Sequence, residues 1–361
     1  MKNLWTFPVL ACFALASCKT EKHDTKLTII DSFKINTIVP DSDNPDELIY
    51  NIGTRMRQDD GTFSLVYFST KDSAIVIQSM YPVANKIQRI SLHSTFDGDQ
   101  IFPNSFAMDG DKFYLYYKNG NIIKELDLSG KLVSKMHIKL TDTSDELLAS
   151  ATYPMDYNNG KFYLAALSNS ERTKNNINAY CDIVFERKGD TLIPTAHSGR
   201  YPSNYSKDYV KFREFNRVLF PSGAILYCFK GSDSVFKANK PTTEGAMSFV
   251  SFTKANGVTK YDTSKMTDMK YLFEYYKLSE QNMFAKFNQA NSLVYIIKKL
   301  KKQTINDPEN FELVAIDNEN KKVVDLTYKN ELIRKDIFFM KDKYLFTGSL
   351  FAPSIVRYEL Q

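Results

Sequence analysis

Short apolar runs bounded by turn residues recur along the chain, and residues 106–136 show the pattern most clearly. A turn at 109–111 precedes the apolar run Phe113–Tyr117, and an Asn119-Gly120 pair follows that run. Such a pair favours a tight hairpin, because both central residues of a type I′ turn need positive φ. Apolar runs this short predict strands, and loops of about two residues join antiparallel neighbours. The stretch therefore predicts a β-meander.

The same order of turn and apolar strand appears in five further stretches, with strands starting near residues 63, 162, 224, 293 and 344. Several of the spacings are close to the 40–50 residues typical of a propeller blade. The pattern predicts an all-β fold, a β-propeller with six blades of antiparallel meanders. The last unit has three strands, so the spare strand at 27–39 is expected to close it. A non-repeating pair of β-sandwiches stays open as the alternative, because the units match in pattern and not residue by residue.

Two longer spacings predict insertions near residues 199–217 and 262–289. The second predicts a helix capped at Thr267-Asp268, with an apolar face that includes Met269, Leu272, Phe273, Tyr276 and Leu278. The first is rich in Tyr and Arg, which are enriched at interaction hot spots. The binding candidates are therefore Tyr201, Tyr205, Tyr209 and Arg213. Alternatively, these aromatic side chains pack the inserted loop onto a blade edge.

The N-terminus predicts export. Residues 1–17 combine the basic Lys2 with an apolar segment of signal-peptide length. The sequence Leu15-Ala16-Ser17-Cys18 resembles a bacterial lipobox, which implies cleavage before Cys18 and lipid on that residue. Residues 18–26 then form a polar tether, and residues 27–361 form a single propeller domain. Lys19 after the cysteine favours the outer membrane. An ordinary secretory signal is the alternative.

Composition and motifs limit the partners and cofactors that the sequence predicts. The net charge of +5 is dispersed, apart from a lysine run at 298–302 that predicts a solvated face, so no nucleic-acid partner is expected. The four histidines show no ligand spacing, and no catalytic or cofactor motif is present, so neither a metal nor a cofactor is predicted. Cys181 and Cys228 form either a disulfide between adjacent blades or two buried free thiols.

Three repeated segments carry a family resemblance: residues 60–63, 110–115 and 160–164, each with a Gly shortly before an aromatic strand. Together with the lipobox they resemble the six-bladed propeller lipoproteins of Bacteroidetes, in particular the DUF4221 family. The motifs are structural. The resemblance implies a fold and a location in the cell envelope. It implies neither an activity nor catalytic residues.

We therefore expect a lipid-anchored β-propeller of the cell envelope that acts as a binding or assembly module, with an envelope protein or a glycan as partner. The alternative is a glycan-active hydrolase or lyase with its site at the axial mouth of the propeller. Carboxylates clustered with His or Arg at that mouth would favour an enzyme. An aromatic patch on an outer face or insertion would favour a partner protein.

Overall fold

The computed structural model describes most of the chain beyond its N-terminal segment. The described residues are 27–34, 54–59, 62–69, 73–81, 86–92, 102–141, 145–150, 153–168, 180–201, 214–232, 234–239, 241, 248–251, 262–265, 267–288, 291–317, 322–329, 337–349 and 354–360. Within them the secondary structure is almost entirely β. No helix in these ranges is long and apolar enough to cross a membrane.

Antiparallel meanders follow one another along the chain, as the turn-and-strand pattern predicts. The first is β2 (Thr54–Asp59), β3 (Thr62–Ser69), β4 (Ala74–Tyr81) and β5 (Ile87–Ser91). The second is β6 (Ser105–Asp109), β7 (Lys112–Tyr117), β8 (Ile122–Leu126) and β9 (Leu132–Ile138).

The third meander joins the second into one larger sheet. It comprises β10 (Asp145–Leu147), β11 (Asp156–Asn158), β12 (Lys161–Ser168), β13 (Tyr180–Lys188) and β14 (Thr191–Arg200). Strands β10 and β11 both pair with β12, at its two ends. The link to the second meander is short, since β14 pairs in parallel with β9 only at Thr191–His137 and Leu192–Ile138.

The remaining strands form four-stranded sheets. One is β15 (Phe215–Leu219), β16 (Ile225–Phe229), β17 (Ser234–Ala238) and β18 (Ser248–Ser251). The next is β19 (Gln281–Asn288), β20 (Leu293–Lys299), β21 (Asn310–Ile316) and β22 (Lys322–Lys329). The last combines β23 (Ile337–Lys341), β24 (Tyr344–Ser349) and β25 (Ser354–Leu360) with β1 (Leu27–Lys34).

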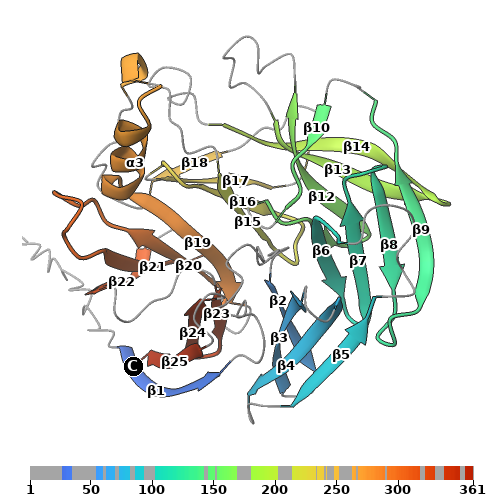
Figure 1. The fold of residues 1–361 in the computed structure, drawn as a ribbon, viewed down its shortest axis with the longest axis horizontal. Coiled ribbons are helices and arrows are strands. Elements are labelled where there is room, and N and C mark those ends of the chain that lie inside the picture. The colour runs from blue at the N-terminus through green and yellow to red at the C-terminus, as the bar shows by residue number, and fades with distance from the viewer. Residues whose placement is uncertain are drawn as a thin grey trace, which may run out of the picture.

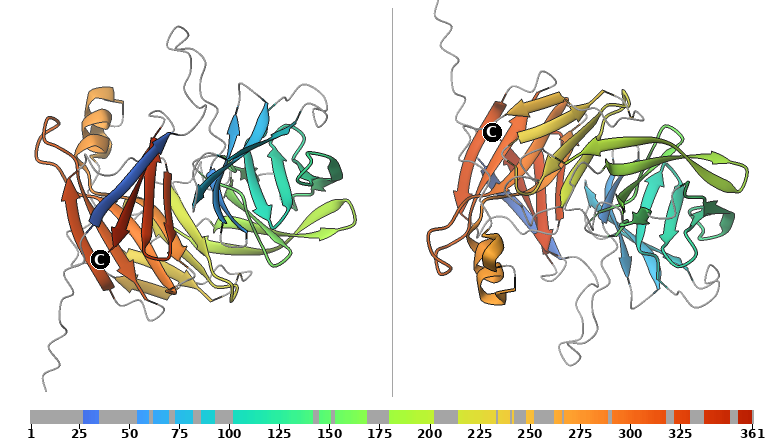
Figure 2. Two further views of the ribbon diagram at one scale, coloured as in Figure 1. Left: turned by 90° about the horizontal axis from the view of Figure 1, so that it is seen from below. Right: turned by 90° about the horizontal axis from the view of Figure 1, so that it is seen from above.

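The pairing of β1 with β25 confirms that the N-terminal strand closes the last sheet. The two strands are antiparallel, with Leu27 opposite Leu360 and Lys34 opposite Ser354. Figure 1 shows the sheets arranged around a common centre, and both views in Figure 2 show β1 alongside β25. The arrangement is that of a β-propeller.

The core lies between neighbouring meanders, because each sheet buries both of its faces. Leu164 and Phe185 of the third meander pack with Tyr114 and Tyr116 of the second. Strands β3 and β4 pack against Phe346 of β24, so the first and last sheets also share a core. This contact closes the ring of packed sheets.

The predicted helix in the second insertion is confirmed as α3 (Met269–Leu278), which stands outside the sheets in Figures 1 and 2. Asp268 is its N-cap, and its carboxylate accepts hydrogen bonds from the backbone N–H groups of Lys270 and Tyr271. Tyr275 is buried against the core between the third and fourth meanders. The inward face differs from the predicted one, since Met269, Phe273 and Tyr276 are exposed.

Candidate functional site

Charged side chains from several sheets meet near the centre of the ring. We define the axial cluster as Arg55 on β2, Asp156 on β11, Asp182 on β13, Arg217 on β15 and Lys286 on β19. The Arg217 Nε lies 2.9 Å from Asp156 Oδ2, and the Arg55 guanidinium lies 3.5 Å from Asp156 Oδ1. Strands β2, β15 and β19 each begin a meander, and β11 directly precedes the hairpin into β12.

Arg217 is the most enclosed member of the axial cluster, with a side chain that is 3% exposed. It forms ion pairs with Asp182 and Asp156 and donates hydrogen bonds to the carbonyls of Pro154 and Tyr163. Burial lowers the pKa of a guanidinium, but the two carboxylates outweigh it and raise the pKa of Arg217. Arg217 is therefore a permanent cation that joins the third and fourth meanders.

Asp182 is fully buried behind Arg217. Its Oδ2 accepts a 2.6 Å hydrogen bond from the Tyr227 hydroxyl. Burial raises the pKa of Asp182 above its usual value, although Arg217 and the Tyr227 hydroxyl act in the opposite direction. Burial also raises the pKa of Tyr227, so the phenol remains a proton donor. This carboxylate holds Arg217 in place and does not line the pocket described below.

Asp156 faces more open surroundings, with a side chain that is 27% exposed. Burial raises its pKa, but the charges of Arg217 and Arg55 outweigh burial and hold the pKa below the usual value. Arg55 is fixed in turn by hydrogen bonds of 2.9 Å and 2.6 Å to the carbonyls of Phe106 and Met155. Asp156 is therefore ionised at neutral pH and offers hydrogen-bond acceptors to solvent or to a ligand.

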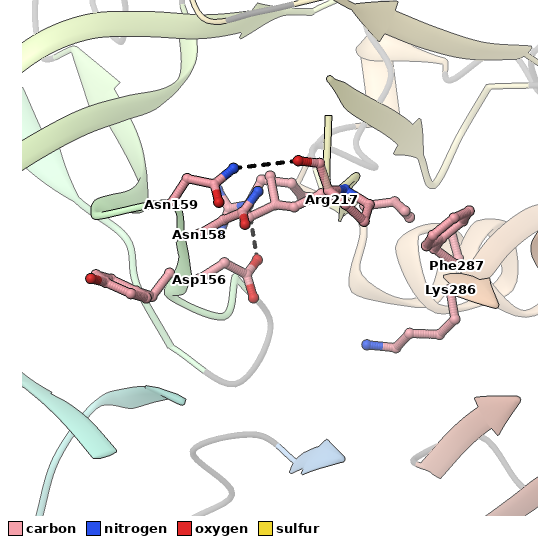
Figure 3. Close-up of a pocket in the computed structure, with 11 residues that line it drawn as sticks. Asp156, Asn158, Asn159, Arg217, Lys286 and Phe287 are labelled. Carbon is pink, nitrogen blue, oxygen red and sulfur yellow. Dashed lines mark hydrogen bonds and ion pairs between the residues drawn. The ribbon is translucent and has the colours of Figure 1, made fainter. Parts of the chain in front are cut away.

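A pocket of about 470 Å³ opens beside the axial cluster, between β11, β15 and β19 (Figure 3). Its described lining residues are Asp156, Tyr157, Asn158, Asn159, Arg217, Val218, Leu219, Pro221, Ala285, Lys286 and Phe287. Ligand pockets commonly measure about 300–1,000 Å³. The pocket therefore has room for a small polar ligand.

The hairpin between β11 and β12 positions two of the lining amides. Asn159 and Gly160 both have positive φ, of 51° and 79°, as a type I′ turn requires. The Asn158 and Asn159 side-chain amides donate to the carbonyls of Phe220 and Pro221, at 3.2 Å and 3.4 Å. The hairpin is thereby tied to the turn after β15, and each amide keeps its oxygen as an acceptor.

Lys286 supplies an amine on the opposite wall. In Figure 3 its side chain extends from β19 toward the side where Asp156 lies. Burial lowers the pKa of Lys286 to about 8, with a further decrease from the positive charge of Arg55 and an opposing effect of Asp156. The axial cluster, as defined, holds three cationic side chains and two carboxylates.

A second candidate surface lies on α3. Met269, Phe273 and Tyr276 are 75%, 54% and 37% exposed. Their spacing of i, i+4 and i+7 places them on one side of the helix. Lys270 and Lys277 are exposed beside them. We call these five residues the α3 face.

The lysine run that was expected to form a solvated face mostly does not. Lys298, Lys299 and Lys302 are buried, whereas Lys301 is exposed. The Lys299 ammonium donates to the carbonyls of Tyr276 and Lys277, at 2.9 Å and 3.0 Å. Lys298 forms an ion pair with Glu280. The prediction is wrong because each buried ammonium has a local partner: the carbonyls at the end of α3 for Lys299, Glu280 for Lys298 and the Ile305 carbonyl for Lys302. Lys299 attaches the end of α3 to β20.

The binding residues expected in the first insertion stay a prediction. Tyr201 is buried, with its ring 5.4 Å from that of Phe229 and 6.4 Å from that of Phe215. Tyr205, Tyr209 and Arg213 lie outside the described residues, and so does the lipidation site Cys18. Cys181 and Cys228 are free, buried thiols. Burial raises the pKa of both, to about 12 for Cys228.

The axial cluster was not identified from sequence. Its members lie on five different strands and are separated from one another by tens of residues. One signal was available. Arg55, Asp156, Arg217 and Lys286 each occupy the strand before a predicted hairpin turn, which is the innermost strand of a propeller blade.

No family model matches the chain, and no curated protein matches it. Among solved structures, a member of the DUF4221 family from Bacteroides vulgatus aligns over 94% of this chain and 99% of that one, with 9% identity and a TM-score of 0.68. The chain has the fold of this DUF4221 protein. The family resemblance of the sequence is thereby confirmed at the level of the fold.

Two further structures align with lower scores. A Bacteroides fragilis protein that is described as exported aligns over 94% of this chain and 96% of its own length, at 10% identity and a TM-score of 0.49. YCF48 from Cyanidioschyzon merolae aligns over 93% of this chain and 98% of its own length, at 10% identity and a TM-score of 0.44.

Proposed function

We propose that this protein is a lipid-anchored binding module of the bacterial cell envelope that docks a partner protein through the α3 face. The observation that carries the proposal is the exposed row of Met269, Phe273 and Tyr276 on a helix that stands outside the ring. Apolar side chains at i, i+4 and i+7 are the anchors by which a helix enters a hydrophobic groove. The DUF4221-like fold supports a rigid scaffold for such a surface.

The chemistry of the α3 face indicates the chemistry of the partner. Lys277 lies over the Phe273 ring, 5.5 Å from its centroid, and Lys270 is exposed nearby. Basic residues around an apolar row complement an apolar groove with an acidic rim. We therefore propose a protein with such a groove as the occupant.

The scaffold that we propose has six blades. They are β2–β5, β6–β9, β11–β14, β15–β18, β19–β22 and β23–β25 with β1. The support is the order of the meanders and the cores shared by neighbouring sheets. A six-bladed ring leaves the axial mouth and the outer edges available for binding.

The anchor that we propose is lipid on Cys18 in the outer membrane, supported by the lipobox-like sequence and by the nine-residue interval before β1. We expect an alkyne-tagged fatty acid to label the full-length chain in a bacterial host with a lipoprotein pathway, and not a Cys18→Ala variant. The measurement is in-gel fluorescence after coupling to a dye. Equal labelling of the two chains would contradict the anchor.

The docking test uses the lipid-free chain from Lys19 to Gln361, immobilised and incubated with envelope extract. We expect a Phe273→Ala/Tyr276→Ala variant to lose a protein that the wild-type chain captures, because two hot-spot contacts of about 2 kcal/mol each amount to roughly a thousandfold loss in affinity. Quantitative mass spectrometry measures the captured protein, and titration with the purified partner gives the affinities.

The matched control is Val133→Ala, because Val133 on β9 is as exposed as Phe273. It should leave capture unchanged. Sequence and structure of the captured protein should place acidic residues around an apolar groove. Capture that survives the α3 double variant, in a chain shown to be folded, would contradict docking through this face.

A glycan hydrolase at the axial mouth receives less support. Among the described residues that line the pocket, Asp156 carries the only carboxyl group. Hydrolysis needs a carboxylic acid that donates a proton, but Arg217 and Arg55 hold the pKa of Asp156 below its usual value. We therefore propose binding, and not hydrolysis, for the pocket.

A further inference from the structure

Strand β11 divides its side chains between the core and the pocket beside the axial cluster, which we call the axial pocket. Asp156 and Asn158 are two positions apart, so they lie on the same face of the strand, and both line the axial pocket (Figure 3). Tyr157 between them faces the core, where its ring stacks on Tyr114 at 4.6 Å and meets Phe162 at 4.8 Å. The polar face of β11 is therefore the one that the pocket receives.

Oxygen acceptors predominate on this wall of the axial pocket. The amides of Asn158 and Asn159 donate to backbone carbonyls of the turn after β15, which leaves both amide oxygens as acceptors. An ionised carboxylate has about four acceptor positions. The carboxylate of Asp156 faces Arg217 at 2.9 Å and Arg55 at 3.5 Å, and its side chain is still 27% exposed. The groups that complement this wall are hydrogen-bond donors.

The charges at this wall already face opposite charges. Arg217 pairs with Asp156 and Asp182, and Asp156 also lies beside Arg55. A cationic ligand would be repelled by Arg217, which lines the same pocket. An anionic ligand would be repelled by Asp156, and it would bring acceptors to a wall of acceptors. A hydroxyl group donates without either repulsion, so an uncharged polyol fits this wall better than an ion.

Spacing and size narrow the polyol to a ring. Asp156 and Asn158 lie two residues apart on a strand, roughly 7 Å from each other along its axis. Two hydroxyl groups on adjacent carbons are too close together to reach both, whereas a six-membered ring carries hydroxyl groups on opposite sides. The pocket volume of about 470 Å³ accommodates such a ring. Pro221 is exposed and Leu219 is half-buried, and both line the pocket, where they offer apolar contact to the C–H groups of the ring.

We propose that the axial pocket binds an uncharged pyranose, the ring form of a neutral sugar, with Asp156, Asn158 and Asn159 accepting hydrogen bonds from its hydroxyl groups. This inference deepens the binding role proposed for the pocket and rests on it. It is independent of the α3 face, which stands outside the ring of sheets. The protein then has two separate binding surfaces, one for a partner protein and one for a neutral sugar.

The test compares glucose, galactose and mannose with glucuronate and glucosamine, which add a negative and a positive charge to the same kind of ring. The chain from Lys19 to Gln361 is titrated with each sugar and followed by saturation-transfer NMR. We expect at least one neutral sugar to bind about tenfold or more tightly than either charged sugar. Asn158→Ala should weaken its binding about three- to tenfold, the usual effect of one lost hydrogen bond. Asn158→Asp keeps an acceptor at this position and should bind within about threefold of the wild-type chain.

The matched control is Asn288→Ala. Asn288 ends β19 and donates to the carbonyl of Asp342 at 2.9 Å, the same kind of contact that Asn158 makes, but it is not among the residues that line the pocket. It should bind the neutral sugar like the wild-type chain, and thermal unfolding should show that every variant is folded.

Three results would each overturn the proposal: no binding of any neutral sugar, binding of a charged sugar as tight as that of the neutral ones, or equal binding by Asn158→Ala and Asn288→Ala. Docking through α3 is measured separately, by capture with the Phe273→Ala/Tyr276→Ala variant. Failure of sugar binding therefore leaves the docking result unchanged, and the two failures can be told apart.

Discussion

Replacing Arg217 with Met will destabilise the fold by about 3–5 kcal/mol, because removing one partner of a buried ion pair leaves the other charge uncompensated. Asp182 is fully buried, and Arg217 is its cationic partner in the axial cluster. The substitution also leaves the carbonyls of Pro154 and Tyr163 without their donor. Urea unfolding followed by circular dichroism measures the loss.

Two companion variants identify the cause. Asp182→Asn/Arg217→Met removes both charges, so it should be more stable than Arg217→Met alone. Tyr227→Phe removes only the hydroxyl that donates to Asp182, and it should cost about 1–3 kcal/mol, the usual effect of losing one buried hydrogen bond. A double variant no more stable than the single one would show that the guanidinium acts by packing and not by charge.

The loss in Arg217→Met should also depend on pH. Burial already raises the pKa of Asp182 in the folded chain, and removal of Arg217 would raise it further. A folded-state pKa above the unfolded one means that the folded chain binds the proton more tightly. The deficit in unfolding free energy should therefore shrink as the pH falls from 7 toward about 5. A deficit that stays constant over this range would contradict the buried carboxylate as its source.

Removing β1 will open the ring. A chain that starts at residue 35 loses the pairing that runs from Leu27–Leu360 to Lys34–Ser354 and leaves β25 as an unpaired edge. At about 0.5–1.5 kcal/mol per hydrogen bond, the lost ladder amounts to several kcal/mol of a total stability of about 5–15 kcal/mol. The exposed edge should also promote self-association. Urea unfolding and light scattering measure the two effects.

The register offers a matched control for this truncation. Because Leu27 lies opposite Leu360 in an antiparallel pair, a short turn after Gln361 can lead directly into residues 27–34. This circular permutant contains the same strand and begins at residue 35, so it should recover stability and remain monomeric. A truncated chain as stable and as monomeric as the permutant would show that β1 does not close the ring.

Local sequence predicted the strands well, because hairpin signals and apolar runs act over a few residues. Asn159-Gly160 takes the positive φ values that its turn type demands, and the run at Phe113–Tyr117 is the buried strand β7. The last sheet could be completed from sequence because it lacked a strand and the N-terminus offered one. These inferences needed only the repeat and the order of its parts.

Contacts between sheets could not be predicted in the same way. The lysine run at 298–302 looked solvated because nothing nearby in the sequence indicated the carbonyls of α3 that it meets. Arg217 is 35 residues from Asp182 and 61 from Asp156, and neither separation is a recognisable motif. The apolar face of α3 was misassigned because aromatic residues occur on both sides of that helix.

The closing strand also has a consequence for the order of events during folding. Leu27 is among the first described residues to be synthesised and Leu360 is the last, so the final sheet cannot form until the whole chain is available. Contacts between such distant residues form slowly, because a long loop must close before any contact stabilises it. The other meanders can form one after another during synthesis. Until β25 is synthesised, the backbone of β1 has no strand to pair with. The slowest step of folding should therefore be ring closure, and it should be faster in the circular permutant, where β1 follows β25 directly.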